Sequence, residues 1–205
     1  ELQKKLPEYD FLYLGDNARA PYGTRSFETV YEFTLQAITY LFEQNCELII
    51  LACNTASAKA LRTIQQNDLP TKFPGKRVLG VIRPSAESVD LFTSSKHVGI
   101  LATEGTVNSE SYLIEIKKLF PNIVVTQQAC PLWVPLIENN KFQTPGGKAL
   151  ILEDLASLLE KDTKIDAIIL GCTHYPIVQH LIQENVSPEI KVISQGEIVA
   201  DKLEN

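Results

Sequence analysis

The stretch LIILACNTAS, residues Leu48–Ser57, gives the strongest indication of the fold. Its apolar run is typical of a buried strand, and a small residue, Cys53 and several polar residues follow where a helix opens. The stretch AIILGCTHYP, residues Ala167–Pro176, repeats this order with Cys172 as its cysteine. Because open α/β sheets bind ligands at the carboxyl ends of their parallel strands, we expect two related sites that face each other across a cleft.

Short apolar runs alternate with longer amphipathic segments along the rest of the chain. The runs predict strands at Phe11–Leu14, Leu48–Leu51, Val78–Ile82, Val98–Leu101, Ile123–Val125, Ala167–Leu170 and Lys191–Ile193. The amphipathic segments predict helices at Ser26–Gln44, Ala56–Asn67, Asn108–Leu119 and Gly147–Lys161. Alternating strands and helices indicate right-handed crossover units, so the predicted class is α/β, with two lobes whose mainly parallel sheets are flanked by helices.

Proline residues mark places where the chain is expected to cross between the lobes. Pro84 follows one predicted strand, and Pro188 precedes another. We predict a first lobe made of residues 1–82 and 189–205, with a second lobe, residues 83–188, inserted between its two parts. Each lobe then carries one of the two cysteine-containing turns.

The composition excludes several classes of protein. The 205 residues are 44% hydrophobic and 21% charged, as in ordinary globular proteins, and no apolar run reaches the roughly 18 residues of a membrane span. The net charge is -6 without a dense Lys/Arg block, so we expect a small-molecule partner rather than nucleic acid or a membrane. The first residues, ELQKKLPEYD, hold no signal-peptide core, and widely separated cysteines are typical of reduced cytoplasmic thiols without a metal.

A single cysteine is most often a buried structural thiol, so Cys53 by itself predicts little. Its neighbours Asn54, Thr55 and Ser57 place amide and hydroxyl groups where a helix begins. A helix N-terminus favours a thiolate and nearby carboxylates, but the same polar residues are also ordinary helix caps. Only the second cysteine makes the catalytic interpretation the stronger one.

Cys172 lies in the same kind of turn and is followed by Thr173 and His174. Imidazole titrates near neutral pH, so His174 is suited to orient or ionise the thiol. The alternative is that His174 caps a helix or lies in the core. The remaining cysteines, Cys46 and Cys130, have no comparable company and are interpreted as structural.

Two opposed thiols without metal partners suit a reaction in which one thiol removes a proton from a carbon and the other returns one to the opposite face. That reaction is a racemisation or an epimerisation. One cysteine must start as the thiolate and the other as the thiol, and the roles exchange in the reverse direction. Because the carbon acid is weak, the site must exclude water and hold the substrate by fixed hydrogen bonds.

Two further stretches fit a small polar ligand. In GDNARAPYGTRS, Tyr22 and Gly23 belong to a predicted turn that presents backbone amides and a phenol hydroxyl, although a plain connection explains them equally well. In LATEGTVNS, Thr103 and Thr106 are candidate contacts on a weaker signal. The sequence contains no phosphate loop and no dinucleotide fingerprint.

The motifs quoted above, with GVIRP and ACPLWVPLIE, stand in the order found in glutamate racemases, and the chain resembles that family over nearly its whole length. The resemblance implies that Cys53 and Cys172 are the catalytic thiols, assisted by His174. In the family, the counterpart of Cys53 acts on the D-enantiomer and that of Cys172 on the L-enantiomer. The implied substrate contacts are Tyr22, Gly23, Asn54, Thr55, Thr173 and His174.

The resemblance also implies two pseudo-symmetric α/β lobes with the active site in the cleft between them. It implies no cofactor, no metal, and a cytoplasmic homodimer that supplies D-glutamate for peptidoglycan and so maintains cell shape. The family pattern begins with a strand and an Asp-Ser-Gly turn that reaches the active site, and it ends in a further helix. Glu1 lies beyond that turn and the chain ends soon after Gln195, so we expect the full protein to contain more residues, which its intact mass would reveal.

Other functions stay open at this point. Aspartate and hydantoin racemases share the paired cysteines, but the Thr-His-Tyr-Pro run after Cys172 favours glutamate, because the aspartate-type pattern usually has an acidic residue there. A non-catalytic glutamate-binding or regulatory relative would keep the cleft without the chemistry, and the intact Cys53, Cys172 and His174 argue against it. A thiol-redox enzyme is disfavoured because the cysteines do not form a compact redox motif.

Overall fold

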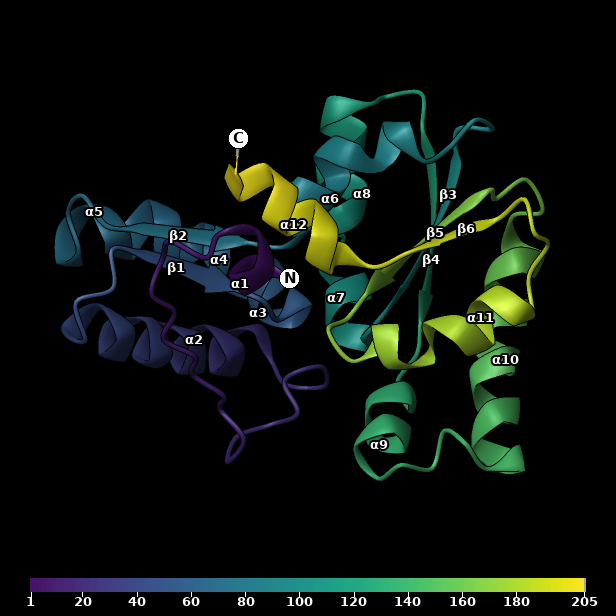
Figure 1. The fold of residues 1–205 in the computed structure, drawn as a ribbon, viewed down its shortest axis with the longest axis horizontal. Coiled ribbons are helices and arrows are strands. Elements are labelled where there is room, and N and C mark those ends of the chain that lie inside the picture. Colours follow the sequence, from purple (N-terminus) through teal and green to yellow (C-terminus); the bar gives the residue numbers. More distant parts are fainter. Residues whose placement is uncertain (205) are drawn as a thin grey trace.

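The computed structural model describes residues 1–204, which form two lobes (Figure 1). The sheet of the first lobe pairs β1 (Leu48–Leu51) with β2 (Arg77–Gly80). The sheet of the second lobe has the order β4-β3-β5-β6, with β3 at His97–Ala102, β4 at Val124–Ala129, β5 at Ala167–Gly171 and β6 at Lys191–Ile193. All strand pairings within residues 1–204 are parallel, which confirms the α/β class, although the two sheets differ in size.

Helices connect and cover the strands. Those of the first lobe are α1 (Leu2–Lys5), α2 (Phe27–Glu43), α3 (Asn54–Lys59), α4 (Leu61–Thr63) and α5 (Leu69–Lys72). The later helices are α6 (Ile82–Ser88), α7 (Glu104–Asn108), α8 (Ser111–Leu119), α9 (Trp133–Glu138), α10 (Pro145–Lys161), α11 (Gln179–Glu184) and α12 (Gln195–Glu204). A π-helical turn at Ile64–Asp68 and 3-10 turns at Val89–Leu91 and Tyr175–Val178 complete the connections.

The sheet of the second lobe is buried on both faces, as a parallel sheet requires. Side chains alternate along each strand, so that in β5 Ile169 points to one face and Ile168 and Leu170 to the other. The first face is covered by α6, α8 and α12, and the second by α9, α10 and α11. This double covering explains why the strands appear in the sequence as continuous apolar runs.

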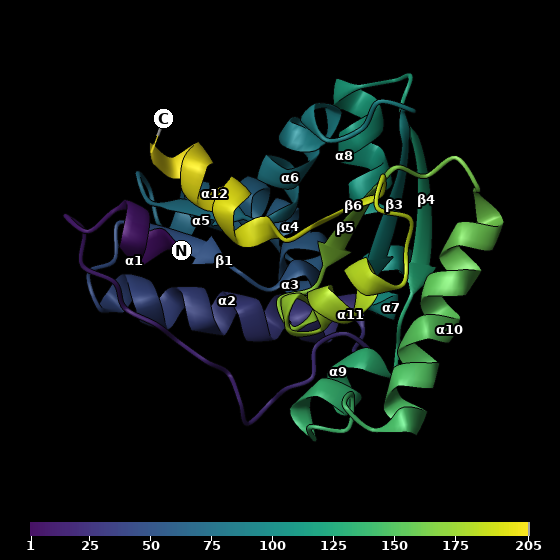
Figure 2. The ribbon, with the colours of Figure 1, turned by 45° about the vertical axis from the view of Figure 1, so that its right-hand side comes forward.

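The predicted division places the chain after residue 189 in the first lobe, whereas its strand belongs to the sheet of the second lobe and α12 contacts α1 of the first lobe. β6 pairs with β5, and the buried side chains of Ile193 and Ile198 join the core of the second lobe. The free edge of β5 offers hydrogen bonds to a following strand, so the tail adds to the sheet that is already beside it. The segment after Gln195 also forms a helix, α12, which lies beside α6 and α1 (Figure 2). The sequence patterns predict no helix in the segment that begins at Gln195.

Two other predicted elements differ from the structure. Phe11–Leu14 is not a strand; it pairs with no strand in the described part of the chain, and Tyr13 is 90% exposed. An apolar run becomes a strand only where a neighbour accepts its backbone hydrogen bonds. The helix expected at Ala56–Asn67 is interrupted at Ala60 and passes into the π-helical turn. The helices expected at Ser26–Gln44 and Gly147–Lys161 are confirmed as α2 and α10.

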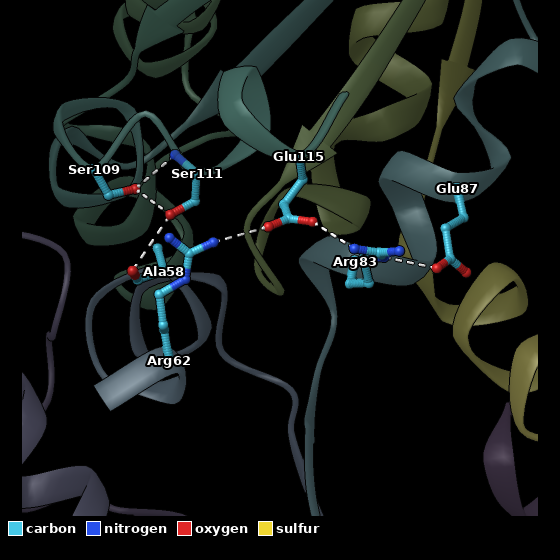
Figure 3. A network of polar contacts seen from close by, with 7 residues as sticks. All are labelled: Ala58, Arg62, Arg83, Glu87, Ser109, Ser111 and Glu115. Carbon is cyan, nitrogen blue, oxygen red and sulfur yellow. Dashed lines mark hydrogen bonds and ion pairs between the residues drawn. The ribbon is translucent and has the colours of Figure 1, made fainter. Parts of the chain in front are cut away.

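Polar contacts join the lobes where α8 lies against α3 and α4 (Figure 3). The carboxylate of Glu115 accepts hydrogen bonds from Arg62 at 3.3 Å and from Arg83 at 2.9 Å. Ser111 adds a hydrogen bond to the backbone oxygen of Ala58 at 3.3 Å. Such partly exposed ion pairs are each worth at most about 1 kcal/mol, so they define the contact more than they stabilise it.

Candidate active site

Cys53 stands at the end of β1 and is the N-cap residue of α3. Its Sγ accepts a hydrogen bond from the backbone N–H of Ala56 at 3.5 Å. The residue keeps some exposed surface, but protein surrounds the thiol itself. This burial raises the pKa of the Cys53 thiol, and the opposing hydrogen bonds from Ala56 and Thr55 do not cancel the effect. Cys53 is therefore a thiol at neutral pH.

Cys172 follows β5 in the second lobe and is 7% exposed. Burial, with a smaller contribution from the charge of Cys53 when that thiol is ionised, raises the pKa of Cys172 to about 12, against hydrogen bonds from the backbone of His174 and Tyr175. The influence of Cys53 on this pKa means that the two thiols lie within electrostatic reach of each other. Two thiolates repel, so the pair favours states in which at least one sulfur keeps its proton.

A carboxylate, an imidazole and a thiol form a chain at Cys172. The Nδ1 atom of His174 lies 3.8 Å from the Cys172 Sγ, and its Nε2 atom makes a short contact with the carboxylate of Glu138 from α9. This chain is suited to carry a proton away from the thiol, with the carboxylate stabilising the imidazolium that forms. The sequence analysis did not identify Glu138. It lies within the ACPLWVPLIE motif, but its partner is 36 positions away.

Tyr22 belongs to a polar cluster on the side of Cys53. Its hydroxyl donates a short hydrogen bond to Asp16, whose carboxylate also accepts a hydrogen bond from Arg19. Burial and these contacts raise the pKa of Tyr22, and the charge of Cys53 acts in the same direction. Tyr22 therefore stays a neutral hydroxyl close to the thiol. Asp16 and Arg19 are not among the site residues predicted from the sequence.

Gly23 lies where the turn of the first lobe touches the second lobe. Its carbonyl oxygen accepts a hydrogen bond from the backbone N–H of Gly105 at 2.8 Å. A Cβ at Gly105 would stand 2.6 Å from that oxygen, and a Cβ at Gly23 would stand 3.0 Å from the Cβ of Thr103. Both positions therefore need glycine for this close approach.

Three threonine hydroxyls meet in the buried contact between α3 and α7. Thr55 lies 2.9 Å from Thr103 and 3.4 Å from Thr106 between Oγ1 atoms, and Thr103 lies 3.1 Å from Thr106. All three are candidate substrate contacts on the sequence patterns. The structure brings them together, but as partners of one another across the lobes.

The other predicted site residues differ in exposure. Asn54 is 2% exposed, and its side-chain amide is bonded to Tyr112 and Gln195. Thr173 is exposed, and its side chain hydrogen-bonds to Cys172. Cys130, expected to be structural, is buried.

A small pocket lies between the two lobes beside this site. Its lining comes from the turn after Ala20 and from the ends of β3 and β4, and consists of Pro21, Gly23, Thr24, Thr103, Glu104, Cys130, Pro131, Val134 and Pro135. Neither Cys53 nor Cys172 lines it. Within residues 1–204, no three His, Cys, Asp or Glu side chains are grouped so as to hold a metal ion, and no helix is long and apolar enough to cross a membrane.

Two cysteines thus follow the ends of parallel strands, and one of them lies beside an imidazole that contacts a carboxylate. The chain belongs to the Asp/Glu/Hydantoin racemase family, which it matches over residues 1–203. A glutamate racemase from Streptococcus agalactiae is 40% identical over 197 residues, which are 96% of this chain and 71% of the relative. The chain is thus a racemase of this family.

Solved structures agree with this assignment. A glutamate racemase isoform from Bacillus anthracis superposes with a TM-score of 0.90 at 32% identity, covering 98% of this chain and 73% of its own. A glutamate racemase from Francisella tularensis, solved in complex with D-glutamate, has a TM-score of 0.86 at 35% identity, with coverage of 98% and 72%.

Proposed function

We propose that this racemase interconverts L- and D-glutamate without a cofactor, by proton transfer between Cys53 and Cys172. The observation that carries the proposal is the chain from Glu138 through His174 to the Cys172 Sγ, with Cys53 within electrostatic reach. The relatives described above are named glutamate racemases, and the structure of one of them was solved in complex with D-glutamate.

The reaction breaks the Cα–H bond on one face of the substrate and forms an S–H bond on the thiolate of that face. The cysteine on the other face then gives its proton to the carbanion, so a Cα–H bond of opposite configuration forms and a thiolate is left. Following the family pattern, Cys53 takes the proton of D-glutamate and Cys172 that of L-glutamate. No atom or electron is lost, and the reverse reaction starts from the exchanged thiolate.

The protonation states fit this scheme. Burial raises the pKa values of both thiols, so both keep their protons at neutral pH and one must lose its proton to an acceptor before the reaction. His174 accepts the proton of Cys172, and the positive ammonium group of the bound substrate stabilises a neighbouring thiolate. A site closed to water strengthens both effects.

Substrate binding is assigned to the groups around the two thiols. The second N–H of the Asn54 amide is suited to a carboxylate of glutamate. The hydroxyls of Tyr22 and Thr173 can donate to the carboxylates if they turn from Asp16 and Cys172 to the substrate. The backbone amides at Gly23 and Thr55 add donors at the two turns. We also propose that the protein is a cytoplasmic homodimer that supplies D-glutamate for peptidoglycan. Size-exclusion chromatography with light scattering tests the dimer.

Racemisation in deuterated water tests the mechanism. The full-length protein and its Cys53→Ala and Cys172→Ala variants are incubated with each glutamate enantiomer, with circular dichroism and α-deuterium followed over time. General acid–base groups contribute on the order of 100- to 10,000-fold to a reaction rate, so we expect each variant to lose at least about 100-fold in racemisation rate. The control variant Cys46→Ala should stay active. Faster turnover of aspartate would reject glutamate as the substrate, and glutamate binding without α-exchange would reject catalysis.

A further inference from the structure

Behind Cys53, three buried side chains form a closed ring of hydrogen bonds. The amide nitrogen of Asn54 donates to the amide oxygen of Gln195 at 2.6 Å, and the amide nitrogen of Gln195 donates to the hydroxyl of Tyr112 at 2.6 Å. That hydroxyl donates to the amide oxygen of Asn54 at 2.7 Å, which closes the ring. The three residues are 2%, 7% and 0% exposed respectively.

The direction of the ring is fixed from outside. The backbone oxygen of Val81 can only accept, and it lies 3.2 Å from the Gln195 amide nitrogen. Ser85 donates its own proton to Val81 at 2.8 Å and therefore accepts from Gln195 at 2.7 Å. The two N–H groups of the Gln195 amide thus serve three acceptors, so one N–H is shared between two of them. A flipped Gln195 would set its oxygen against the Val81 oxygen, so both amides are held in one orientation.

The ring connects the catalytic turn of the first lobe to the second lobe. Asn54 is the first residue of α3 and follows Cys53, whereas Tyr112 lies in α8 and Gln195 begins α12. Burial raises the pKa of Tyr112, so its hydroxyl keeps the proton that it donates to Asn54. Each polar atom of the Asn54 amide has one partner in the ring, which leaves one N–H and one oxygen lone pair for a substrate.

We propose that Gln195 and Tyr112 are positioning residues for the proton transfer at Cys53, acting through Asn54. The proposal rests on the proposed two-cysteine function. A buried ring with one allowed orientation holds the Asn54 amide, and with it the adjoining Cys53, against rotation. Gln195 and Tyr112 form no hydrogen bond with the thiol of Cys53 or Cys172. Their effect is therefore on the geometry of the turn that contains Cys53 and Asn54.

The test uses full-length Gln195→Met and Tyr112→Phe variants. Methionine keeps the length of Gln195, and phenylalanine keeps the ring that packs near Gly171, where a Cβ would lie 3.2 Å from Tyr112 Cε2. Gln65→Met is the matched control, because Gln65 makes a 2.8 Å side-chain hydrogen bond to the backbone of Val78 inside the first lobe. For Gln195→Met we expect kcat/KM to fall on the order of 100-fold, and for the control to stay near wild type.

Primary isotope effects separate positioning from general damage. The two enantiomers have equal free energy, so kcat/KM must fall equally in both directions. With α-deuterated substrates, slowing the Cys53 step raises the isotope effect for D-glutamate and not for L-glutamate. The double variant should lose less than the product of the single losses, because either change opens the same ring.

Several results would overturn this proposal. Unchanged isotope effects in Gln195→Met with a lowered rate mean that the variant only reduces the amount of folded enzyme. Wild-type rates in Tyr112→Phe, the variant that alters the fold least, mean that the ring does not act on Cys53. A wild-type protein that does not exchange the α-proton of glutamate overturns the proposed function instead, and this proposal falls with it.

Discussion

At the scale of single residues, Glu138 is the group whose role depends most on its charge. In the proposed mechanism, His174 becomes positive when it takes a proton from Cys172, and the carboxylate on its other nitrogen stabilises that state. The side chain of Glu138 is 61% exposed and that of His174 is 32% exposed, so water and salt screen the pair. The contribution of this carboxylate should accordingly be moderate.

Glu138→Gln keeps the shape of the side chain and removes its charge. We expect kcat to fall about ten-fold, which corresponds to about 1.4 kcal/mol, and the fall to be smaller at high salt. Steady-state racemisation measured by circular dichroism checks this. Glu184→Gln is the control, since Glu184 lies 3.3 Å from His180 in an exposed pair within α11. A Glu138→Gln variant as fast as wild type would remove the carboxylate from the mechanism.

At the scale of elements, the start of α10 contains neighbouring glycines with opposite requirements. Gly147 is buried, and a Cβ there would stand 2.1 Å from the backbone oxygen of Lys141, whereas a Cβ at Gly146 would meet nothing within 4 Å. Thr144 caps the helix by accepting a hydrogen bond from the Gly147 N–H at 3.1 Å. The backbone around this turn therefore leaves no room for a side chain at Gly147 and leaves space for one at Gly146.

Alanine at these two positions should act in opposite directions. Gly147→Ala forces the backbone apart and should lower the free energy of unfolding by about 1–3 kcal/mol. Gly146→Ala should raise it by up to about 1 kcal/mol, because alanine loses less backbone entropy in a helix. Urea unfolding of both variants measures the difference. Equal stabilities would show that the turn before α10 relaxes freely.

At the scale of the whole molecule, the buried thiols make stability depend on alkaline pH. Burial raises the pKa of Cys172 from 9.0 to about 12, so the folded protein keeps a proton that the unfolded chain releases. This contribution is complete below about pH 9 and is lost as the pH rises toward about 12. The free energy of unfolding should fall with a slope of up to about 1.4 kcal/mol per pH unit for this one group.

Cys172→Ser should flatten that slope relative to wild type, because serine does not titrate in this range. Lysine and tyrosine residues also titrate there, so only the difference between the two proteins is informative. The single tryptophan, Trp133, is fully buried in the second lobe and reports unfolding by its fluorescence. Identical slopes for the two proteins would mean that Cys172 ionises in the folded state as easily as in the unfolded chain.

Local patterns were enough to predict most strands, the α/β class and the two cysteine turns. Each of these depends on residues that are neighbours in the chain, such as Ile168 and Leu170, whose alternation reports a strand buried on both faces. Phe11–Leu14 shows the limit of such patterns. Its apolar residues match those of a strand, but backbone pairing depends on what lies beside it.

Sequence patterns alone identify two cysteines after two strands, with a histidine beside the second, as the candidates for the proposed chemistry. The groups that surround these residues are defined by three-dimensional packing. Asn54 and Gln195 are separated by 141 positions, and Glu138 and His174 by 36. A residue's type and local spacing express its own conformational preference, whereas a contact between distant residues exists only after packing has closed the chain between them.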